Sequence, residues 1–191
     1  MPYSSDEGKR WIREAVWLAL ESAPTRSDGA GGQFVPRVLD VGAGSGTYAK
    51  LIAGGPYADR VVHMTGIEIH APYVERFGLH AMYDELIIGD VVEVALPSAE
   101  VVILGDVLEH LALADALAVW AKARRAATGA VFLSLPIVEW PQGECEGNPH
   151  EAHVEVWSHA RVLAELDGIV AYEVGAQVGV YKASPSSGSE W

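Results

Sequence analysis

A glycine-rich stretch is the part of the sequence best suited to hold a ligand. Gly42, Gly44 and Gly46 directly follow the apolar run VLDV at 38–41. Glycines let the backbone turn tightly after a strand and let a ligand approach without a Cβ in the way. The spacing differs from the dinucleotide fingerprint, in which two residues separate the second and third glycines. The sequence therefore predicts a ligand-binding turn that does not suit NAD, although a tight connection without a ligand has the same glycines.

Three acidic residues end the apolar runs that come next. Glu68 lies in the run 61–69, Asp90 ends the run 86–90, and Asp106 ends the run 101–106. Ligands of open α/β sheets bind at the carboxyl ends of the strands, so these side chains should lie near the glycine turn. A carboxylate offers only acceptors and therefore suits two vicinal hydroxyls. Each acid considered alone is also a common helix cap.

A second cluster combines carboxylates with imidazoles. Asp106 is followed by Glu109 and His110, and a long polar segment at 137–157 adds His150 and His153. Carboxylate oxygens and imidazole nitrogens can together hold Mg²⁺, Mn²⁺ or Zn²⁺. His153 and His110 are also the candidate general bases, with Asp106 beside them as a candidate catalytic residue. The alternative is that Glu109 and His110 only begin a helix and pack.

Short apolar runs alternate with helical patterns from residue 34 onward. Continuous Val/Ile/Leu runs are typical of strands that helices bury on both faces, so a parallel α/β sheet is expected. Two closely spaced runs near the end predict an antiparallel hairpin. The predicted strands are 34–41, 61–69, 86–90, 101–106, 130–136, 169–175 and 177–183. Four helices are predicted between the strands. Two of them end near residues 53 and 77, and the other two cover about 111–126 and 158–167.

The chain divides into three predicted parts: an N-terminal helix with a flexible linker at 1–33, one folded domain at 34–183, and a disordered tail at 184–191. Apolar residues recur with helical spacing over 5–21, and Ser4 and Glu7 have the spacing of a capping box. The linker is rich in glycine, so we expect the helix to act as a lid over the ligand.

Composition limits the partners. The 191 residues include 13 Lys and Arg against 26 Asp and Glu, a formal charge of −13, which disfavours nucleic acid and anionic lipid. Apolar runs such as 15–20 are far too short to span a bilayer, and no signal pattern precedes them. One cysteine cannot form an internal disulfide. We expect a cytoplasmic protein that acts on a small molecule, whereas the oligomeric state stays open.

The glycine turn and its lead-in resemble motif I of the class I S-adenosylmethionine-dependent methyltransferases. The resemblance implies a three-layer Rossmann-like fold with a mostly parallel seven-stranded sheet and S-adenosyl-L-methionine as cofactor. It implies that Glu68 accepts the ribose hydroxyls, Ile69 packs on the adenine, Asp90 contacts its amino group and Asp106 lies beside the methyl group. The remaining implied cofactor residues are Asp40, Gly42, Ala43, Gly44 and Gly46.

The acidic-x-x-Glu-His cluster resembles the metal site of ubiquinone-biosynthesis O-methyltransferases and of small-RNA 2′-O-methyltransferases. The resemblance implies Asp106, Glu109, His110 and His153 as ligands of a divalent metal, with Asp where those enzymes have Glu. The leading hypothesis is a methyltransferase that acts on a small-molecule acceptor, preferably a hydroxyl oxygen. The alternatives are a metal-dependent RNA 2′-O-methyltransferase and a non-catalytic binding protein with the same fold.

Overall fold

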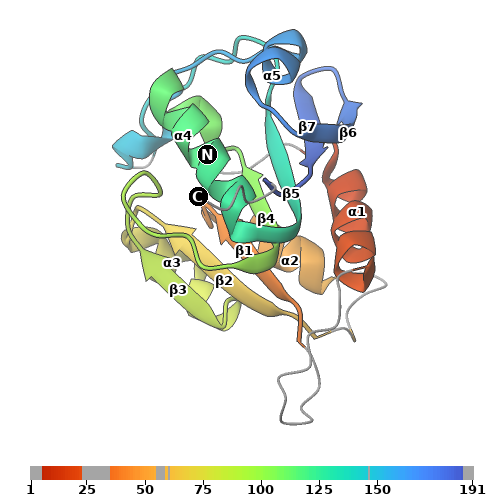
Figure 1. Cartoon of the computed structure of the whole chain (residues 1–191). Helices are drawn as coiled ribbons and strands as arrows, with labels where there is room; N and C mark the ends of the chain where they lie inside the picture. Colours follow the sequence, from red (N-terminus) through yellow and green to blue (C-terminus); the bar gives the residue numbers. More distant parts are fainter. Residues whose placement is uncertain (1–5, 23–34, 55–58, 60, 146, 187–191) are drawn as a thin grey trace.

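A computed structural model describes residues 6–22, 35–54, 59, 61–145 and 147–186 of the chain. Seven strands form one sheet in the order β3-β2-β1-β4-β5-β7-β6 (Figure 1). β7 runs antiparallel to both of its neighbours, and the other pairs are parallel. The predicted mostly parallel sheet with a C-terminal hairpin is confirmed. The strands are β1 Arg37–Val41, β2 His63–Glu68, β3 Glu85–Ile88, β4 Ala99–Gly105, β5 Ala127–Pro136, β6 Ile169–Val174 and β7 Val178–Ala183.

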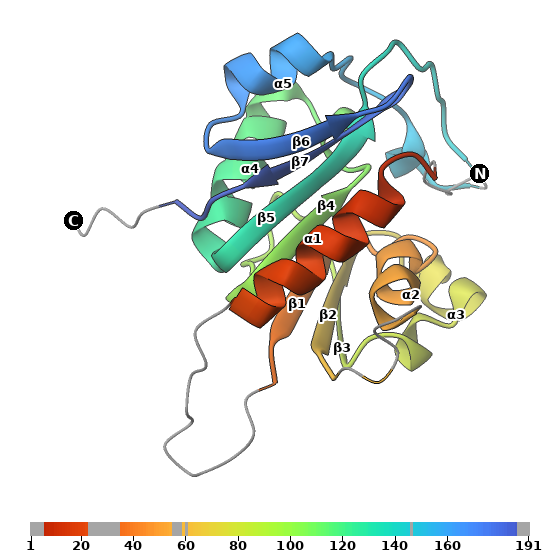
Figure 2. The same cartoon turned by 90° about the vertical axis from the view of Figure 1, so that its right-hand side faces the viewer.

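Helices cover both faces of the sheet and give three layers. α1 and α2 lie across one face, and α4 and α5 lie behind the other (Figure 2). The α-helices are α1 Lys9–Ser22, α2 Thr47–Ala53, α3 Pro72–Phe77, α4 Leu113–Ala126 and α5 His159–Glu165. Three short 3₁₀ helices complete the described elements: η2 Leu79–Ala81, η3 Leu108–His110 and η4 Pro149–Glu151.

The central strand β4 explains why the apolar runs are continuous. Val101 and Ile103 belong to the core under α1 and α2, whereas Val102 and Leu104 belong to the core under α4 and α5. All four side chains are fully buried. Successive residues of a strand point to opposite faces. A strand that is covered on both faces therefore needs apolar side chains at successive positions.

The N-terminal helix is part of the core. α1 begins at Lys9, four residues later than the predicted pattern, and packs against β4 and β5. Ile12 and Val16 are 0% exposed, and Trp17 Nε1 donates to the Ile52 carbonyl at 3.3 Å. α1 therefore forms one layer of the fold, because its apolar stripe packs against the sheet.

The residues just before α1 bind the last strand. The Glu7 carboxylate accepts hydrogen bonds from the backbone N–H groups of Gln177 (3.0 Å) and Val178 (2.8 Å). Glu7 thus joins the segment before α1 to β7. The predicted capping box includes Ser4, which lies outside the described residues. Gly8 follows with φ +72° against Val180, where a Cβ would overlap the valine side chain. This anchor fixes the direction in which Lys9 enters the fold.

The domain ends slightly later than predicted. Ser184 N–H donates to the Gly168 carbonyl, and Ser186 N–H donates to the Arg124 carbonyl, both at 3.0 Å. The first three residues of the predicted tail are therefore held against the domain, and residues 187–191 lie outside the described part. The predicted linker at 23–33 also lies outside it. Among the described residues, no helix is long and apolar enough to cross a membrane.

Candidate functional site

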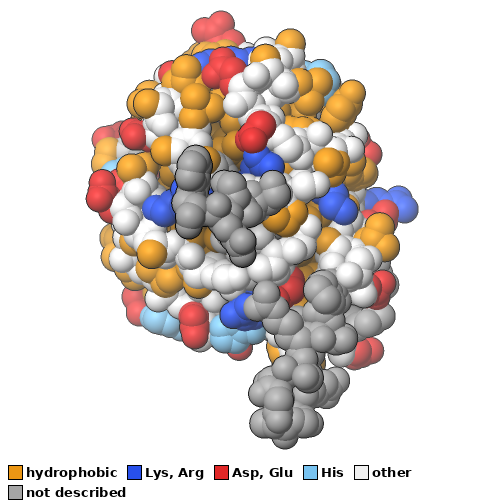
Figure 3. All heavy atoms as spheres, in the orientation of Figure 1, with side chains coloured by type: hydrophobic (Ala, Val, Ile, Leu, Met, Phe, Trp, Pro, Cys, Tyr) orange, Lys and Arg blue, Asp and Glu red, His pale blue; other side chains and the backbone are white. Residues whose placement is uncertain are grey.

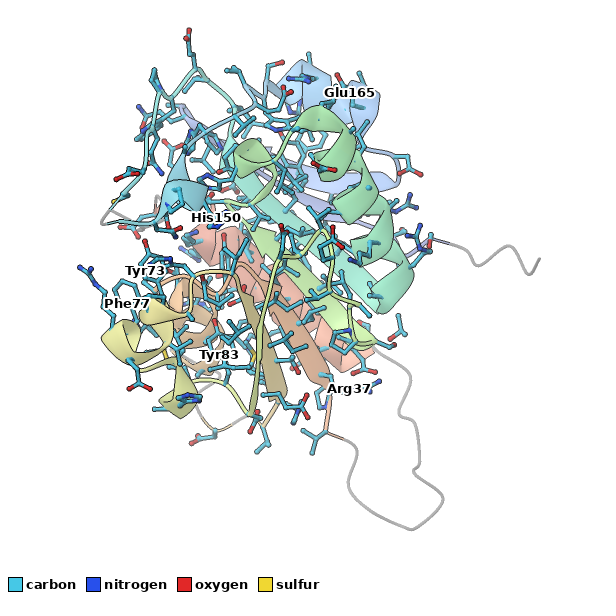
Figure 4. The ribbon with its side chains drawn as sticks, turned by 90° about the vertical axis from the view of Figure 1, so that its left-hand side faces the viewer. Arg37, Tyr73, Phe77, Tyr83, His150 and Glu165 are labelled. Atoms are coloured by element: carbon cyan, nitrogen blue, oxygen red, sulfur yellow. The ribbon has the colours of Figure 1, made fainter. Side chains whose placement is uncertain are left out.

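One cavity of about 500 Å³ opens at the carboxyl ends of the parallel strands. Its wall combines the glycine turn, the strand ends, η3 and the long loop after β5. Figure 4 labels His150 from this loop and Tyr73 from α3, which lie near each other on the same side of the molecule. Seven predicted cofactor residues line the cavity: Gly42, Ala43, Gly44, Glu68, Ile69, Asp90 and Asp106. The predicted catalytic and metal residues Glu109, His110 and His153 line it too.

The glycine spacing follows from the backbone of the turn. Gly42, Gly44 and Gly46 have φ values of +76°, +51° and +75°, a left-handed conformation that side chains rarely adopt. Each alternate residue must therefore be glycine. The N–H groups of Gly42 and Ala43 both donate to the Ile67 carbonyl at 2.9 Å, which binds the turn to the end of β2.

Glu68 connects the turn to its own strand end. Its Oε2 accepts from Gly44 N–H at 2.7 Å and its Oε1 accepts from His70 N–H at 2.8 Å. The side chain is 4% exposed, and burial raises the pKa of Glu68. Each carboxylate oxygen has a second lone pair, so Glu68 can hold the turn and still accept from a ligand hydroxyl.

Asp90 follows β3 and also has a local structural contact. Its Oδ1 accepts from Val92 N–H at 2.8 Å, which fixes the turn after the strand. The residue nevertheless lines the cavity. The described chain has a turn and no helix at 90–94, so Asp90 does not cap a helix there, and its turn contact is compatible with a ligand contact.

Two predicted cofactor residues do not line the cavity. Asp40 is 0% exposed, and its Oδ2 accepts from the Tyr83 hydroxyl at 2.5 Å. Burial raises the pKa of Asp40 to about 7, although the Tyr83 hydrogen bond opposes the shift. Gly46 precedes α2, and a Cβ there would overlap the Met82 sulfur. Both residues support the turn from the side away from the cavity. Asp40 lies inside the sheet on β1, and Gly46 packs against Met82 before α2.

Asp106 has an unusual backbone for its residue type. Its φ of +55° is the only positive value at a described residue other than glycine. Its N–H donates to the Ser134 carbonyl at 2.8 Å, and its Oδ1 accepts from Ser134 Oγ at 3.3 Å. Such strained residues concentrate at functional sites, and this one lines the cavity.

Lys9 lies beneath Asp106 and was missed by the sequence analysis. Its Nζ donates to the Tyr48 hydroxyl at 2.8 Å and lies 4.0 Å from Asp106 Oδ2. The residue is 7% exposed, and burial lowers the pKa of Lys9 while Asp106 and Asp40 oppose the shift. A lysine at the start of an amphipathic helix gives no sequence signal of burial, because such lysines usually face solvent.

Glu109, His110 and His153 form a compact group. One ligand atom from each lies within 4.8 Å of the others, and Asp106 is not part of the group. Glu109 is 1% exposed, and neither of its carboxylate oxygens has a hydrogen-bond partner among the described residues. Burial raises the pKa of Glu109 well above its usual range, and the charge of Asp106 raises it further. The structure thus brings together three of the four predicted metal residues.

The hydrogen bonds of the two histidines fix which ring nitrogen is available. His110 Nδ1 lies 3.2 Å from the Ala152 carbonyl, and His153 Nδ1 lies 2.7 Å from the Trp140 carbonyl. A carbonyl only accepts, so both Nδ1 atoms carry the proton and both Nε2 atoms keep a lone pair. Burial is the main factor that lowers the pKa of each histidine. Either Nε2 can therefore accept a proton or bind a metal ion.

The loop at 137–157 is organised by its own polar side chains. Asn148 is 2% exposed, its Oδ1 accepts from His150 N–H at 3.0 Å, and the Glu151 carboxylate accepts from the Tyr73 hydroxyl at 3.1 Å. Gln142 Nε2 donates to the Glu151 carbonyl at 2.8 Å. No motif in the sequence marks Gln142, Asn148 or Glu151, although all three line the cavity.

Two of three aromatic side chains near the site lie on the cavity wall. Tyr48 and Trp140 line the cavity, and Trp140 is 41% exposed. Trp157 is 1% exposed and belongs to the core that contains α4 and α5. Trp157 lies in a polar segment of the sequence, so its burial could not be predicted from the local pattern.

Comparisons with known proteins agree with this geometry. Residues 39–132 match the profile of a methyltransferase domain family. No curated protein sequence matches the chain significantly. The fold is similar to that of the N-terminal domain of EvdMO1 with S-adenosylhomocysteine bound (18% identity, 95% of this chain and 82% of that one, TM-score 0.63). It is also similar to a DhpI complex with S-adenosylhomocysteine (16% identity, 93% and 87%, TM-score 0.64).

A third structure is an O-methyltransferase, NcsB1, from neocarzinostatin biosynthesis, in complex with S-adenosylhomocysteine and 1,4-dihydroxy-2-naphthoic acid. It is 19% identical, with 92% of this chain covered and a TM-score of 0.57. This chain spans 56% of the length of that protein. At these identities the likeness concerns the fold.

Proposed function

We propose that this chain, a class I S-adenosylmethionine-dependent methyltransferase by its fold and its matched domain, methylates a hydroxyl oxygen of a small-molecule acceptor. The observation that carries the proposal is the single cavity in which the left-handed glycine turn and Glu68 meet Asp106, His110 and His153. Two of the similar structures were solved with hydroxyl compounds, apigenin and 1,4-dihydroxy-2-naphthoic acid. These ligands support a small hydroxyl acceptor.

The cofactor half of the cavity is formed by the glycine turn, Glu68, Ile69 and Asp90. We assign Glu68 to the ribose hydroxyls. Its carboxylate lines the cavity, is held in place by Gly44 N–H, and keeps lone pairs that can accept from two hydroxyls. Ile69 offers an apolar contact to the adenine ring, and Asp90 an acceptor to its amino group. When bound, S-adenosylmethionine would supply the methyl group, and Asp106, His110 and His153 line the part of the cavity left for the acceptor.

The transfer itself is an in-line displacement. The acceptor oxygen forms a bond to the methyl carbon, the carbon–sulfur bond breaks, and its electron pair stays on sulfur, which becomes a neutral thioether. The hydroxyl proton passes to the Nε2 of His153 or His110, each held by a backbone carbonyl at Nδ1. Positioning by the loop at 137–157 contributes the rest of the acceleration.

A second candidate arrangement uses the same side chains to hold a divalent metal. The favouring observation is the buried Glu109 carboxylate, which has no partner among the described residues and has one ring nitrogen of His110 and one of His153 within 4.8 Å of a carboxylate oxygen. An unpaired buried carboxylate is costly, and a cation would compensate for it. Mg²⁺, Mn²⁺ or Zn²⁺ fits this donor set, with Glu109, His110 and His153 as ligands. When bound, the ion would acidify an acceptor hydroxyl.

The two alternative functions have less support. An RNA 2′-O-methyltransferase needs a basic groove, and on the face shown in Figure 3 the Lys and Arg side chains are scattered singly. Among the described residues, neither Lys nor Arg lines the cavity. A non-catalytic binding protein would not need Nε2 atoms free beside a buried acid.

Calorimetric titration with S-adenosylhomocysteine tests the proposal. The wild-type chain should bind it, and Glu68→Gln should weaken binding by about 1–3 kcal/mol, the cost of charge-assisted hydrogen bonds. Glu173→Gln on β6, an exposed residue outside the cavity, is the matched control and should bind normally. Binding of NAD in place of S-adenosylhomocysteine would overturn the assignment. Mass spectrometry of a hydroxyl-compound panel incubated with S-adenosylmethionine then detects the methylated acceptor.

A further inference from the structure

The charge of the cavity wall carries information about the acceptor. Five carboxylates line the cavity, namely Glu68, Asp90, Asp106, Glu109 and Glu151, and no described Lys or Arg lines it. Three described lysines contact residues of the wall without lining the cavity themselves: Lys9 Nζ lies 4.0 Å from Asp106 Oδ2, Lys50 Nζ donates to the Ser45 carbonyl at 2.8 Å, and Lys122 Nζ donates to the Val91 carbonyl at 2.8 Å. We propose, on the basis of the proposed function, that the acceptor carries no negative charge and is an uncharged or cationic hydroxyl compound.

Two of the carboxylates belong to the part of the wall that the cofactor assignments do not use. Glu109 is 1% exposed, and both of its carboxylate oxygens are buried without a hydrogen-bond partner among the described residues. Glu151 is held by neutral donors, the Tyr73 hydroxyl at 3.1 Å and Asn148 Nδ2 at 3.4 Å. These contacts orient the carboxylate without neutralising it.

An anionic acceptor would meet these groups at close range. Two like charges in contact at a protein surface repel by several kcal/mol, and the repulsion grows as water is excluded. A divalent ion at Glu109 would not reverse the sign, because two positive charges against five carboxylates still leave a negative wall. Without an ion, Glu109 is uncharged because burial raises its pKa, and the other four carboxylates keep the wall negative.

The remaining groups suit an acceptor with a flat or apolar body. Trp140 is 41% exposed and lines the cavity, and Leu111 and Pro136 add apolar surface. Gln142 and the histidines supply neutral polar contacts. The aromatic ring also gives a favourable face to a cationic group. The 1,4-dihydroxy-2-naphthoic acid bound by NcsB1 carries a carboxylate as well as hydroxyl groups, so we expect the acceptor of this chain to share the hydroxyl group but to differ in charge.

Charged nitroxide probes test the inference without knowledge of the acceptor. The chain is labelled with 5-fluorotryptophan, and the ¹⁹F resonance of Trp140 is assigned with Trp140→Phe. Aminomethyl-, carbamoyl- and carboxy-PROXYL are then compared with saturating S-adenosylhomocysteine present. We expect the cationic probe to relax Trp140 severalfold more than the anionic one, and more than it does at Trp11, which reports the general effect of the net charge.

Matched variants localise the effect. Glu151→Gln should reduce the ratio of cationic to anionic relaxation at Trp140, whereas Glu173→Gln, which changes the net charge equally from an exposed site on β6, should not. Asp106→Asn serves in place of Glu151→Gln if the latter fails to fold. Equal ratios at Trp140 and Trp11, or an unchanged ratio in the cavity variants, would overturn the inference. Absence of S-adenosylhomocysteine binding in the same sample would instead contradict the proposed function.

Discussion

The Nζ atom of Lys9 donates a 2.8 Å hydrogen bond to the Tyr48 hydroxyl, and this bond joins the first residue of α1 to the first turn of α2. Tyr48 in turn lines the cavity and packs so closely against Gly105 that a Cβ there would overlap its ring. The N-terminal helix therefore supports the cavity floor. Its anchor is the preceding Glu7, which binds β7.

Replacing Lys9 with methionine should destabilise the fold. Methionine keeps most of the side-chain volume but leaves the buried Tyr48 hydroxyl without its donor and Asp106 without its near cation. We expect a loss of about 1–3 kcal/mol in the free energy of unfolding, measured with urea. Arg10→Met is the control, because Arg10 makes only an exposed pair with Glu14 and should change stability by less than about 1 kcal/mol. Equal stability of the two variants would mean that the burial cost of the Lys9 charge offsets its contacts.

A methyl group on Gly44 should impair cofactor binding more than folding. A Cβ there would meet only the Gly42 carbonyl at 3.8 Å and would otherwise extend into open space at the cavity wall. Gly44→Ala should therefore lower S-adenosylhomocysteine affinity on the order of tenfold, equivalent to about 1.4 kcal/mol of steric conflict.

Gly78→Ala is the matched control for this prediction. Gly78 has a similar left-handed φ of +65°, no atom within 4 Å of its Cβ position, and no place in the cavity wall. Both variants should lose about 1 kcal/mol of stability from backbone strain. Only Gly44→Ala should lose affinity, and calorimetry that finds the same loss in both would remove Gly44 from the binding site.

The buried Asp40 should make stability depend on pH. Burial raises the folded-state pKa from 3.8 to about 7, so the unfolded chain releases this proton at lower pH than the folded one. The contribution of Asp40 to stability is then most favourable below about pH 4 and is lost as pH rises toward 7, by up to about 4 kcal/mol. Asp40→Asn can still accept from the Tyr83 hydroxyl and does not titrate. Its stability relative to the wild type should increase between pH 4 and 7 in urea unfolding, and a constant difference would contradict the shift.

The fold, and the meeting of most of the predicted cofactor residues at one cavity, could largely be predicted from the sequence. Continuous apolar runs and the left-handed glycines are local signals, and each predicted strand lies within a few residues of an observed one. Burial was less predictable where it depends on distant partners. Lys9 is buried because Glu7 binds β7, and Asp40 is behind the turn because β1 is central in the sheet. The Glu151 carboxylate accepts hydrogen bonds from Asn148 and from Tyr73, which lies on α3. A contact between residues so far apart in the chain cannot be predicted from sequence spacing.

The structure and the sequence motif predict different ligands for the candidate metal site, because the motif includes Asp106 and the structural group does not. If Glu109, His110 and His153 hold the ion, Mn²⁺ binding followed by electron paramagnetic resonance should weaken about tenfold or more in Glu109→Gln and in His153→Ala. Asp106→Asn should retain affinity, because Asp106 is outside the group although the motif includes it. His80→Ala, which removes an exposed histidine on η2, is the control. Unchanged Mn²⁺ affinity in all variants would exclude this site and leave His153 and His110 as metal-free bases.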